Sequence, residues 1–187
     1  MNYTQISEKV AQWMNRDDLT ARIPDFIELT EERLNRHLRV RQMEIALPAT
    51  AITNNVITPA ADVLDAKALW VPNYERTPLA AQSLESVVAA GAEGIPTMYA
   101  WDGASLRFDG GGDVQGVLYQ RIPALATSGT NWVGDGPWSL YLFGALLEAA
   151  LYVGDDPTAW QLRFEQVLGE VQGNDQRRSG PLVARPR

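Results

Sequence analysis

The spacing of apolar residues changes twice along this chain, and that change limits the fold more than any other feature. Near the N-terminus apolar residues recur every three to four positions, as on one face of an α-helix. After Arg41 they alternate with other residues, as in a β-strand, and from Pro137 the helical spacing returns. The pattern predicts an α+β fold: N- and C-terminal helix pairs form one bundle, and a small antiparallel β unit is inserted between them.

Four helices are expected at the two ends of the chain, where capping residues mark their limits. Pro24 stands at a favourable first helical position, and Asp156 followed by Pro157 makes a similar start for the last helix. Gly154 is placed to end the helix before it. The predicted ranges are about 4–15, 24–38, 137–153 and 157–172.

The β insertion is expected over about residues 40–125. Asn54-Asn55 and Asp102-Gly103 are both typical of tight turns between antiparallel strands. Ser83 is placed to cap a short helix that Gly91 would end. These signals predict several short strands and one short helix.

The amino-acid composition excludes several kinds of site and partner for this chain. The 187 residues are 45% hydrophobic, which suits one good core, and the absence of cysteine excludes disulfides and thiolate metal sites. The net charge is −7, and Lys9 and Lys67 are the only lysines, so broad binding to a phosphate backbone is not expected. The longest apolar run, residues 138–153, is shorter than a membrane span and contains Glu148. It predicts a core or interface helix and no membrane partner.

Catalytic motifs are scarce. His37 is the only histidine, and neither a G-x-S-x-G elbow nor a phosphate-binding G-x-x-x-x-G-K-[ST] loop occurs. Residues 110–112 are three glycines without the flanking residues of a phosphate or calcium loop, which indicates a β-loop tip. We therefore expect no enzyme activity, no cofactor and no metal site. The alternative is a glycan-binding or peptidoglycan-cleaving protein; its candidate residues are Asp109, Asp113 and Glu148, with Trp101, Trp132 or Trp138 as a sugar platform.

The last fifteen residues differ from the rest of the chain. Residues 1–172 are acidic overall, whereas residues 173–187 carry four arginines against one acidic side chain. This segment shows neither helical nor strand periodicity and could bury too little apolar surface to order itself alone. It is therefore either a frayed end or an arm that folds against a partner. Its candidate contact residues are Arg177, Arg178, Leu182, Val183, Arg185 and Arg187.

A second cluster of arginines lies at the end of the second predicted helix. Arg33, Arg36, Arg39 and Arg41 follow the acidic Glu28, Glu31 and Glu32. One interpretation is a phosphate-binding face. The other, favoured by the neighbouring carboxylates, is a solvated or intersubunit salt-bridge face, because the planar guanidinium pairs well with carboxylates.

Seven short stretches carry a further signal: WMNRDDL at 13–19, IPDFIEL at 23–29, ERLNR at 32–36, LRVRQME at 38–44, GIPT at 94–97, LYQRIPAL at 118–125 and LYLFGALLEAA at 140–150. Their order and spacing are more specific than any one of them. Together they resemble the head-to-tail adaptor proteins of tailed bacteriophages, the group that includes tubular tail protein A and the gatekeeper proteins of short-tailed phages. The resemblance covers about residues 3–175.

The resemblance implies a structural virion protein without catalysis, located in the tail connector and assembled in the host cytoplasm. Such adaptors form homo-oligomeric rings, usually of twelve copies, that bind the portal protein, extend the DNA channel and provide the platform for the tail nozzle. Portal docking would fall on residues 173–187. An acidic body suits a channel through which genomic DNA passes without specific binding, because like charges do not attract.

Overall fold

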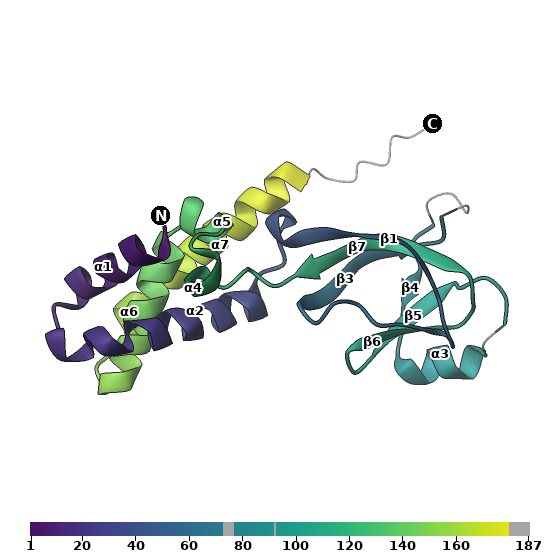
Figure 1. The fold of residues 1–187 in the computed structure, drawn as a ribbon, viewed down its shortest axis with the longest axis horizontal. Helices are drawn as coiled ribbons and strands as arrows, with labels where there is room; N and C mark the ends of the chain where they lie inside the picture. Colours follow the sequence, from purple (N-terminus) through teal and green to yellow (C-terminus); the bar gives the residue numbers. More distant parts are fainter. Residues whose placement is uncertain (73–76, 92, 180–187) are drawn as a thin grey trace. The chain divides into compact units, whose positions relative to one another are not determined.

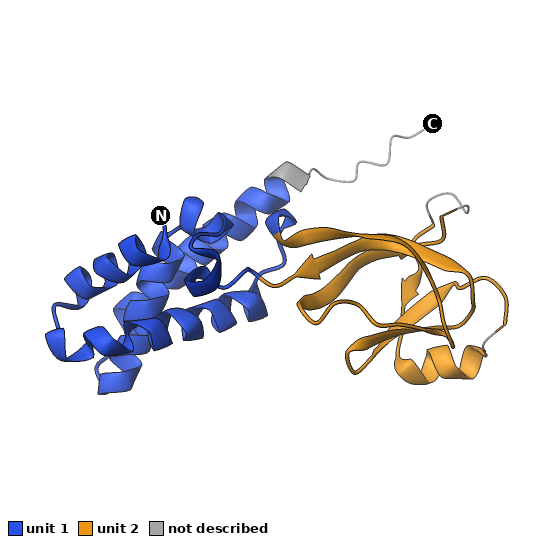
Figure 2. Ribbon diagram, viewed as in Figure 1, with its two compact units in different colours: residues 1–42, 122–187 blue, residues 43–121 orange. Residues whose placement is uncertain are grey.

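The computed structural model describes residues 1–72, 77–91 and 93–179, and for 178 and 179 the backbone only. It confirms the α+β class. The chain divides into two compact units (Figure 2): residues 1–42 with 122–187, here called the helical unit, and residues 43–121, the β unit. The chain thus leaves the helical unit once and returns to it.

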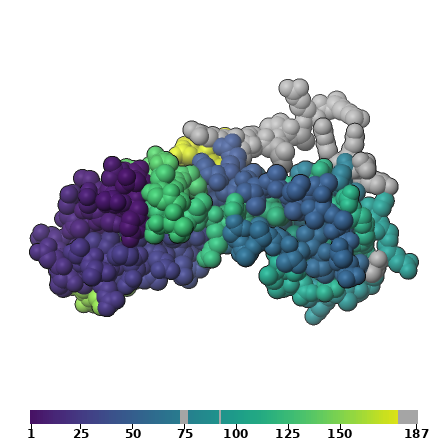
Figure 3. Space-filling view, in the orientation of Figure 1, coloured from purple at the N-terminus to yellow at the C-terminus, as the bar shows by residue number. Residues whose placement is uncertain are grey.

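The helical unit is organised around one apolar helix. Its elements are α1 (Tyr3–Met14), η1 (Asp17–Arg22), α2 (Ile23–His37), the start of η2 (Arg41–Met43), α4 (Leu125–Ser128), α5 (Trp132–Asp135), α6 (Ser139–Val153) and α7 (Thr158–Ser179). Helix α6 packs against α1, α2 and α7 (Figure 1). In the space-filling view the purple N-terminal residues lie against a green segment from the second half of the chain (Figure 3), and the backbone N–H of Tyr3 donates a hydrogen bond of 3.0 Å to the carbonyl oxygen of Gly129.

Local sequence accounts for the ends of the main helices. Asn2 and Gln5 form a reciprocal capping box at the start of α1, and Asn15 ends that helix in a left-handed conformation at φ 47°. Helix α2 has a proline in its first turn, as expected. Gly154 closes α6 at φ 79°.

Helices α2 and α6 approach each other closely at one glycine. A Cβ placed on Gly144 would lie 2.3 Å from Cγ2 of Thr30, far inside van der Waals contact. Thr30 is fully buried, and its hydroxyl donates a hydrogen bond of 2.7 Å to the carbonyl oxygen of Phe26. Only glycine therefore fits at position 144 with the two helices at this spacing.

The β unit contains two small sheets. Its elements are β1 (Glu44–Ala51), β2 (Val56–Ile57), β3 (Val63–Trp70), β4 (Ala80–Ala81), α3 (Leu84–Ala90), β5 (Met98–Asp102), β6 (Ser105–Phe108) and β7 (Asp113–Gln120). One sheet has the order β1-β7-β3 and the other β2-β6-β5-β4. The described strand pairings are antiparallel, as expected, except that the two-residue β4 pairs with β5 in parallel.

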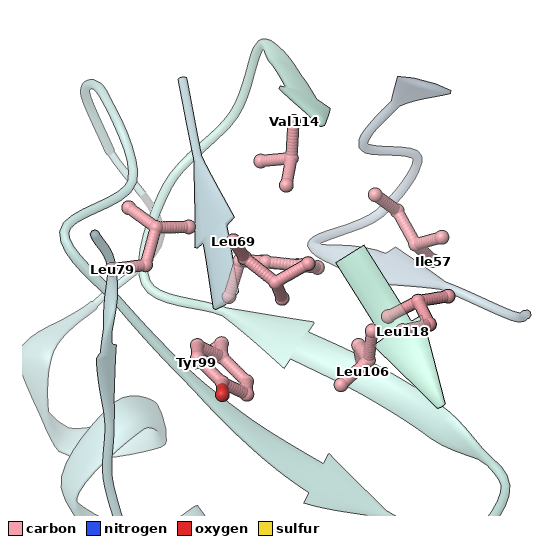
Figure 4. Packing of buried hydrophobic residues seen from close by; sticks show 8 residues of the cluster. Ile57, Leu69, Leu79, Tyr99, Leu106, Val114 and Leu118 are labelled. Atoms are coloured by element: carbon pink, nitrogen blue, oxygen red, sulfur yellow. The ribbon is translucent and has the colours of Figure 1, made fainter. Parts of the chain in front are cut away.

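The predicted turns of the β unit are confirmed. Strands β5 and β6 form a hairpin through Gly103, which has φ 62°, and Asn54 and Asn55 both take positive φ between Thr53 and Val56. Ser83 caps α3 as expected. The core between these elements consists of residues that are at most 8% exposed (Figure 4): Ile57, Leu69, Leu79, Tyr99, Leu106, Phe108, Val114 and Leu118.

Helix α7 extends beyond its predicted end. The sequence indicated loss of regular structure from Gly173, but residues 173–179 continue the helix, so the predicted boundary was wrong there. Contacts with the end of α2 explain the difference: the side chain of Gln172 donates to the carbonyl oxygen of His37, and Asp175 pairs with Arg41. Tertiary contacts thus override Gly173, which lowers helix propensity in this part of α7.

Candidate functional site

Hydrogen bonds hold the last two turns of α7 against the end of α2 and the residues that follow it. The Oδ1 atom of Asp175 accepts hydrogen bonds from the backbone N–H of Arg41 at 3.2 Å and from its Nε at 3.1 Å. Gln172 adds a hydrogen bond of 3.1 Å from its Nε2 to the carbonyl oxygen of His37. The segment that leads to residue 180 therefore leaves the helical unit from a fixed helix.

Replacing Asp175 with alanine should loosen this end of α7 without unfolding the unit. The pair is partly exposed, so we expect a loss of about 0–1 kcal/mol in the free energy of unfolding. Amide hydrogen exchange at residues 172–179 should become faster, because the contact with α2 is lost. Glu170→Ala, on an exposed position of the same helix, is the control, and equal acceleration in both variants would contradict the anchoring role of Asp175.

The structure describes only part of the predicted arm. Arg177 is exposed, and its Nη2 donates a hydrogen bond of 2.6 Å to Oδ1 of Asn174. Arg178 lies within α7. The remaining candidates fall outside the described residues: Leu182, Val183, Arg185 and Arg187.

The arginines at the end of α2 have different surroundings. Nε of Arg33 donates at 3.0 Å to Oε1 of Glu148 on α6, an ion pair within the helical unit. Arg36 is exposed, and its Nε lies 3.4 Å from the carbonyl oxygen of Glu32 on the same helix.

Arg39 and Arg41 complete the same region. Nη1 of Arg39 donates to the carbonyl oxygens of Asn35 and Leu38 at 2.8 and 2.6 Å, which satisfies acceptors at the end of α2. Arg41 pairs with Asp175, as described above. Arg33 and Arg41 thus bind carboxylates of their own chain, and the predicted intersubunit role of the series stays a prediction.

A buried polar network, which sequence reasoning missed, fixes the segment between the β unit and α6. Oε1 of Glu31 accepts hydrogen bonds from the backbone N–H of Leu125 at 2.7 Å and from the hydroxyl of Tyr141 at 3.0 Å. That hydroxyl in turn accepts from Nδ2 of Asn131 at 2.8 Å. Burial raises the pKa of Glu31, although hydrogen bonds from Leu125 and Tyr141 oppose the shift.

The same network continues along α2. Oδ1 of Asn35 accepts from the backbone N–H of Ile122 at 2.8 Å, one turn away from Glu31. The sequence favoured a solvated or intersubunit salt-bridge face for the arginines and the neighbouring carboxylates, but Glu31 is buried and does not belong to such a face. A signal was present: positions 30 and 31 lie between Ile27 and Leu34 on the apolar stripe, where two polar residues need buried partners.

The carboxylates named for glycan cleavage have structural partners. Oδ1 of Asp109 accepts from the backbone N–H of Thr97 and of Met98, at 2.8 and 3.0 Å, and Oδ2 accepts from the Thr97 hydroxyl at 2.6 Å. Burial would raise the pKa of Asp109, but these hydrogen bonds outweigh it and lower the pKa. Asp109 therefore stays ionised. It holds the backbone at Thr97 and Met98 in place and is not suited to donate a proton. Glu148 is held by Arg33, and Asp113 is exposed at the start of β7.

The tryptophan candidates lie in different settings. Trp101 belongs to β5, and its indole N–H donates at 3.3 Å to Oδ1 of Asp65. Trp132 begins α5, and its Nε1 is buried with no hydrogen-bond partner among the described residues. Trp138 directly precedes α6. Trp132 and Trp138 thus lie at the two ends of the segment that enters α6.

The glycine run packs as part of the β unit. A Cβ on Gly110 would lie 2.6–2.9 Å from backbone atoms of Gly94, Ile95 and Pro96, so this glycine permits close contact with that loop. His37 is an exposed residue at the end of α2. Within residues 1–72, 77–91 and 93–179, no three His, Cys, Asp or Glu residues form a group suited to a metal ion. Among the described helices, none combines the length and apolarity needed to cross a bilayer.

Comparison with known families shows to which protein family this chain belongs. The sequence matches the family described as SU10 adaptor protein over residues 1–185, nearly the whole chain. The chain belongs to the SU10 adaptor protein family. Comparison with curated proteins finds no match.

Membership of this family confirms the predicted resemblance to phage head-to-tail adaptors. The protein is a structural adaptor, which implies a non-enzymatic role and a place in the virion. For this SU10-family adaptor, the fixed end of α7 and the basic segment after it form the candidate contact site.

Proposed function

We propose that this adaptor forms a homo-oligomeric ring, with twelve copies, that binds the portal protein of the phage head through residues 173–187. The ring extends the DNA channel and offers a platform to the tail nozzle protein. It assembles in the host cytoplasm. The main support is the end of α7, which Asp175 and Gln172 fasten to α2 and which leads into a basic segment.

The arm is suited to an acidic partner. Four arginines lie between residues 177 and 187, and guanidinium groups form strong paired hydrogen bonds with carboxylates. The base of the arm is already held against α2 by Asp175 and Gln172, which limits the entropy lost on docking. Leu182 and Val183 add an apolar contact between the two pairs of arginines.

The acidic character of the remaining chain supports passage of DNA. Residues 45–172 carry fourteen acidic against five basic side chains, so a channel built from this protein would not attract phosphates. In a ring, Arg36 is the most suitable of the four helix-end arginines for contact with a neighbouring copy, because it is exposed and, within the described part of the chain, its guanidinium contacts a backbone carbonyl oxygen of its own helix and no carboxylate.

Replacing Arg177, Arg178, Arg185 and Arg187 with serine should abolish binding to portal rings while the protein stays folded. We expect binding to be lost because the substitutions remove four charge-assisted contacts at one site. Co-sedimentation with purified portal rings measures how much of the variant binds.

The matched control is a variant in which four arginines outside the arm are replaced with serine: Arg16, Arg22, Arg107 and Arg163. This variant should still bind portal rings. If the arm variant co-sediments as well as the wild type, or if both variants fail equally, the arm is not the portal-binding element.

A further inference from the structure

A groove in the helical unit is lined mainly by apolar side chains: Leu19 and Leu146 form its buried wall, and Trp13 is largely exposed beside it. It lies between α1, η1, α6 and the start of α7 and has a volume of about 340 Å³. We call it the Trp13 groove; its main apolar lining residues are Trp13, Met14, Leu19, Leu146, Val153 and Trp160.

Trp13 is unusually exposed for a residue on the apolar side of α1. It is 52% exposed, yet its ring makes edge contacts with Phe143 at 6.1 Å and with Trp160 at 6.3 Å between centroids. A large aromatic side chain held in place beside a hollow is typical of a surface that receives another apolar group.

The rim of the Trp13 groove is acidic. Asp155 and Asp156 line it. The only cation among its described lining residues, Arg16, makes two hydrogen bonds with Asp18, at 2.9 and 2.8 Å, and interacts more weakly with Asp155. Most of the charge of Arg16 is therefore balanced by Asp18. The two aspartates at the start of α7 favour a ligand with positive charge next to its apolar part.

Residues 180–187 have this combination of properties. Their sequence is GPLVARPR, with the apolar pair Leu182-Val183 followed by Arg185 and Arg187, and no acidic side chain. Proline at 181 and 186 restricts the chain, which lowers the entropy lost on binding in an extended form.

Geometry excludes insertion of Leu182 and Val183 into the groove of the same copy. Trp160, in the groove, and Ser179, at the end of α7, are nineteen residues apart on one helix, a separation of about 28 Å at about 1.5 Å per residue. Val183 is four residues beyond Ser179 and can reach back at most about 14 Å. An occupant with this sequence must therefore come from another copy.

We propose that residues 180–187 of a second copy of this chain occupy the Trp13 groove. Leu182 and Val183 fill the apolar part, and Arg185 and Arg187 face Asp155 and Asp156. This contact goes beyond the proposed function, because it joins adaptor to adaptor before the portal is present. The portal would then compete with the groove for the same segment.

Sedimentation velocity of the full-length protein without portal tests this proposal. We expect self-association that grows with protein concentration and weakens with added salt. Leu182→Ser/Val183→Ser should weaken it at least about tenfold, since two apolar side chains no longer enter the groove. Asp155→Arg should weaken it through charge repulsion, whereas Asp113→Arg, the same change at an exposed site of the β unit, should not.

Mixing the two weakened variants gives the decisive result. The Asp155→Arg protein has an intact tail, and the Leu182→Ser/Val183→Ser protein has an intact groove, so their mixture should form heterodimers at a concentration at which each variant alone is mainly monomeric. The proposal is overturned if the wild type does not self-associate, if either variant associates as the wild type does, or if the mixture stays monomeric. None of these results depends on portal binding, so they leave the proposed function to its own test.

Discussion

Replacing Glu31 with alanine should destabilise the helical unit by about 3 kcal/mol, because the backbone N–H of Leu125 loses its acceptor and the Tyr141 hydroxyl loses one of its two partners inside the core. Chemical denaturation followed through the far-UV helical signal measures this change. Glu28→Ala, at an exposed position of the same helix, should change the free energy of unfolding by less than about 0.5 kcal/mol. Equal effects at the two positions would show that the network contributes nothing beyond helix propensity.

Replacing Glu31 with glutamine should instead preserve the network and remove its pH dependence. The amide oxygen can accept both hydrogen bonds, and the neutral side chain no longer carries a charge into the core. Burial raises the pKa of Glu31 above its ordinary value of 4.5, so the folded state binds the proton more tightly than the unfolded state. In the wild type this residue's contribution to stability is therefore greatest at low pH and falls as the pH rises from about 4.5 through the raised pKa.

The measurement is the free energy of unfolding between pH 4 and pH 8, roughly the range in which carboxyl groups with a raised pKa titrate. We expect the Glu31→Gln variant to lose less stability than the wild type as the pH increases across this range. A wild-type slope that the substitution leaves unchanged would mean that Glu31 does not titrate in the folded protein.

The second large effect is expected at Gly144. A methyl group there would overlap Thr30, so Gly144→Ala should cost about 2–3 kcal/mol by forcing α2 and α6 apart. Gly169→Ala on α7 is a matched control, because nothing lies within 4 Å of a Cβ at that position. It should stabilise the protein by about 0.5–1 kcal/mol, the usual gain from glycine to alanine in a helix.

A double-mutant cycle identifies the overlap as the cause. Thr30→Ala removes the two atoms nearest to the added methyl group, at 2.3 and 2.8 Å, so in that background Gly144→Ala should cost much less. If the costs of the two substitutions simply add, the close approach of α2 to α6 is not what requires glycine at 144.

Local signals in the sequence predicted most elements of the fold. The helical spacing and caps predicted α1, α2 and α6 to within two residues at each end, and Ser83 with Gly91 predicted α3. Asp102-Gly103 predicted the β5–β6 hairpin. These features depend on neighbours in the sequence, which is why one sequence sufficed to predict them.

Features that depend on distant contacts were not predictable. The parallel pairing of β4 with β5 involves two residues on each strand, too few for a periodic pattern. The last turns of α7 contain Gly173 and form because Asp175 and Gln172 reach α2, a contact that no local pattern encodes. The buried state of Glu31 needed the return of residues 122–131 to the helical unit.

The candidate site was predictable in part. The resemblance to phage adaptors, confirmed by the match over residues 1–185, came from seven short stretches in order. The groove around Trp13 was not foreseen, because helical spacing places Trp13 on the same side of α1 as the buried Ile6 and Val10, and yet Trp13 is 52% exposed. Periodicity places a side chain on a face but does not tell which part of that face a neighbouring helix covers.

Cryo-electron microscopy of the full-length protein mixed with portal rings tests the central claim most directly. We expect a closed ring of adaptor subunits on the portal, with the chain beyond Ser179 of each subunit lying against the portal surface. A mixture in which the adaptor stays unbound, or a complex in which residues 180–187 point away from the portal, would contradict the proposed attachment.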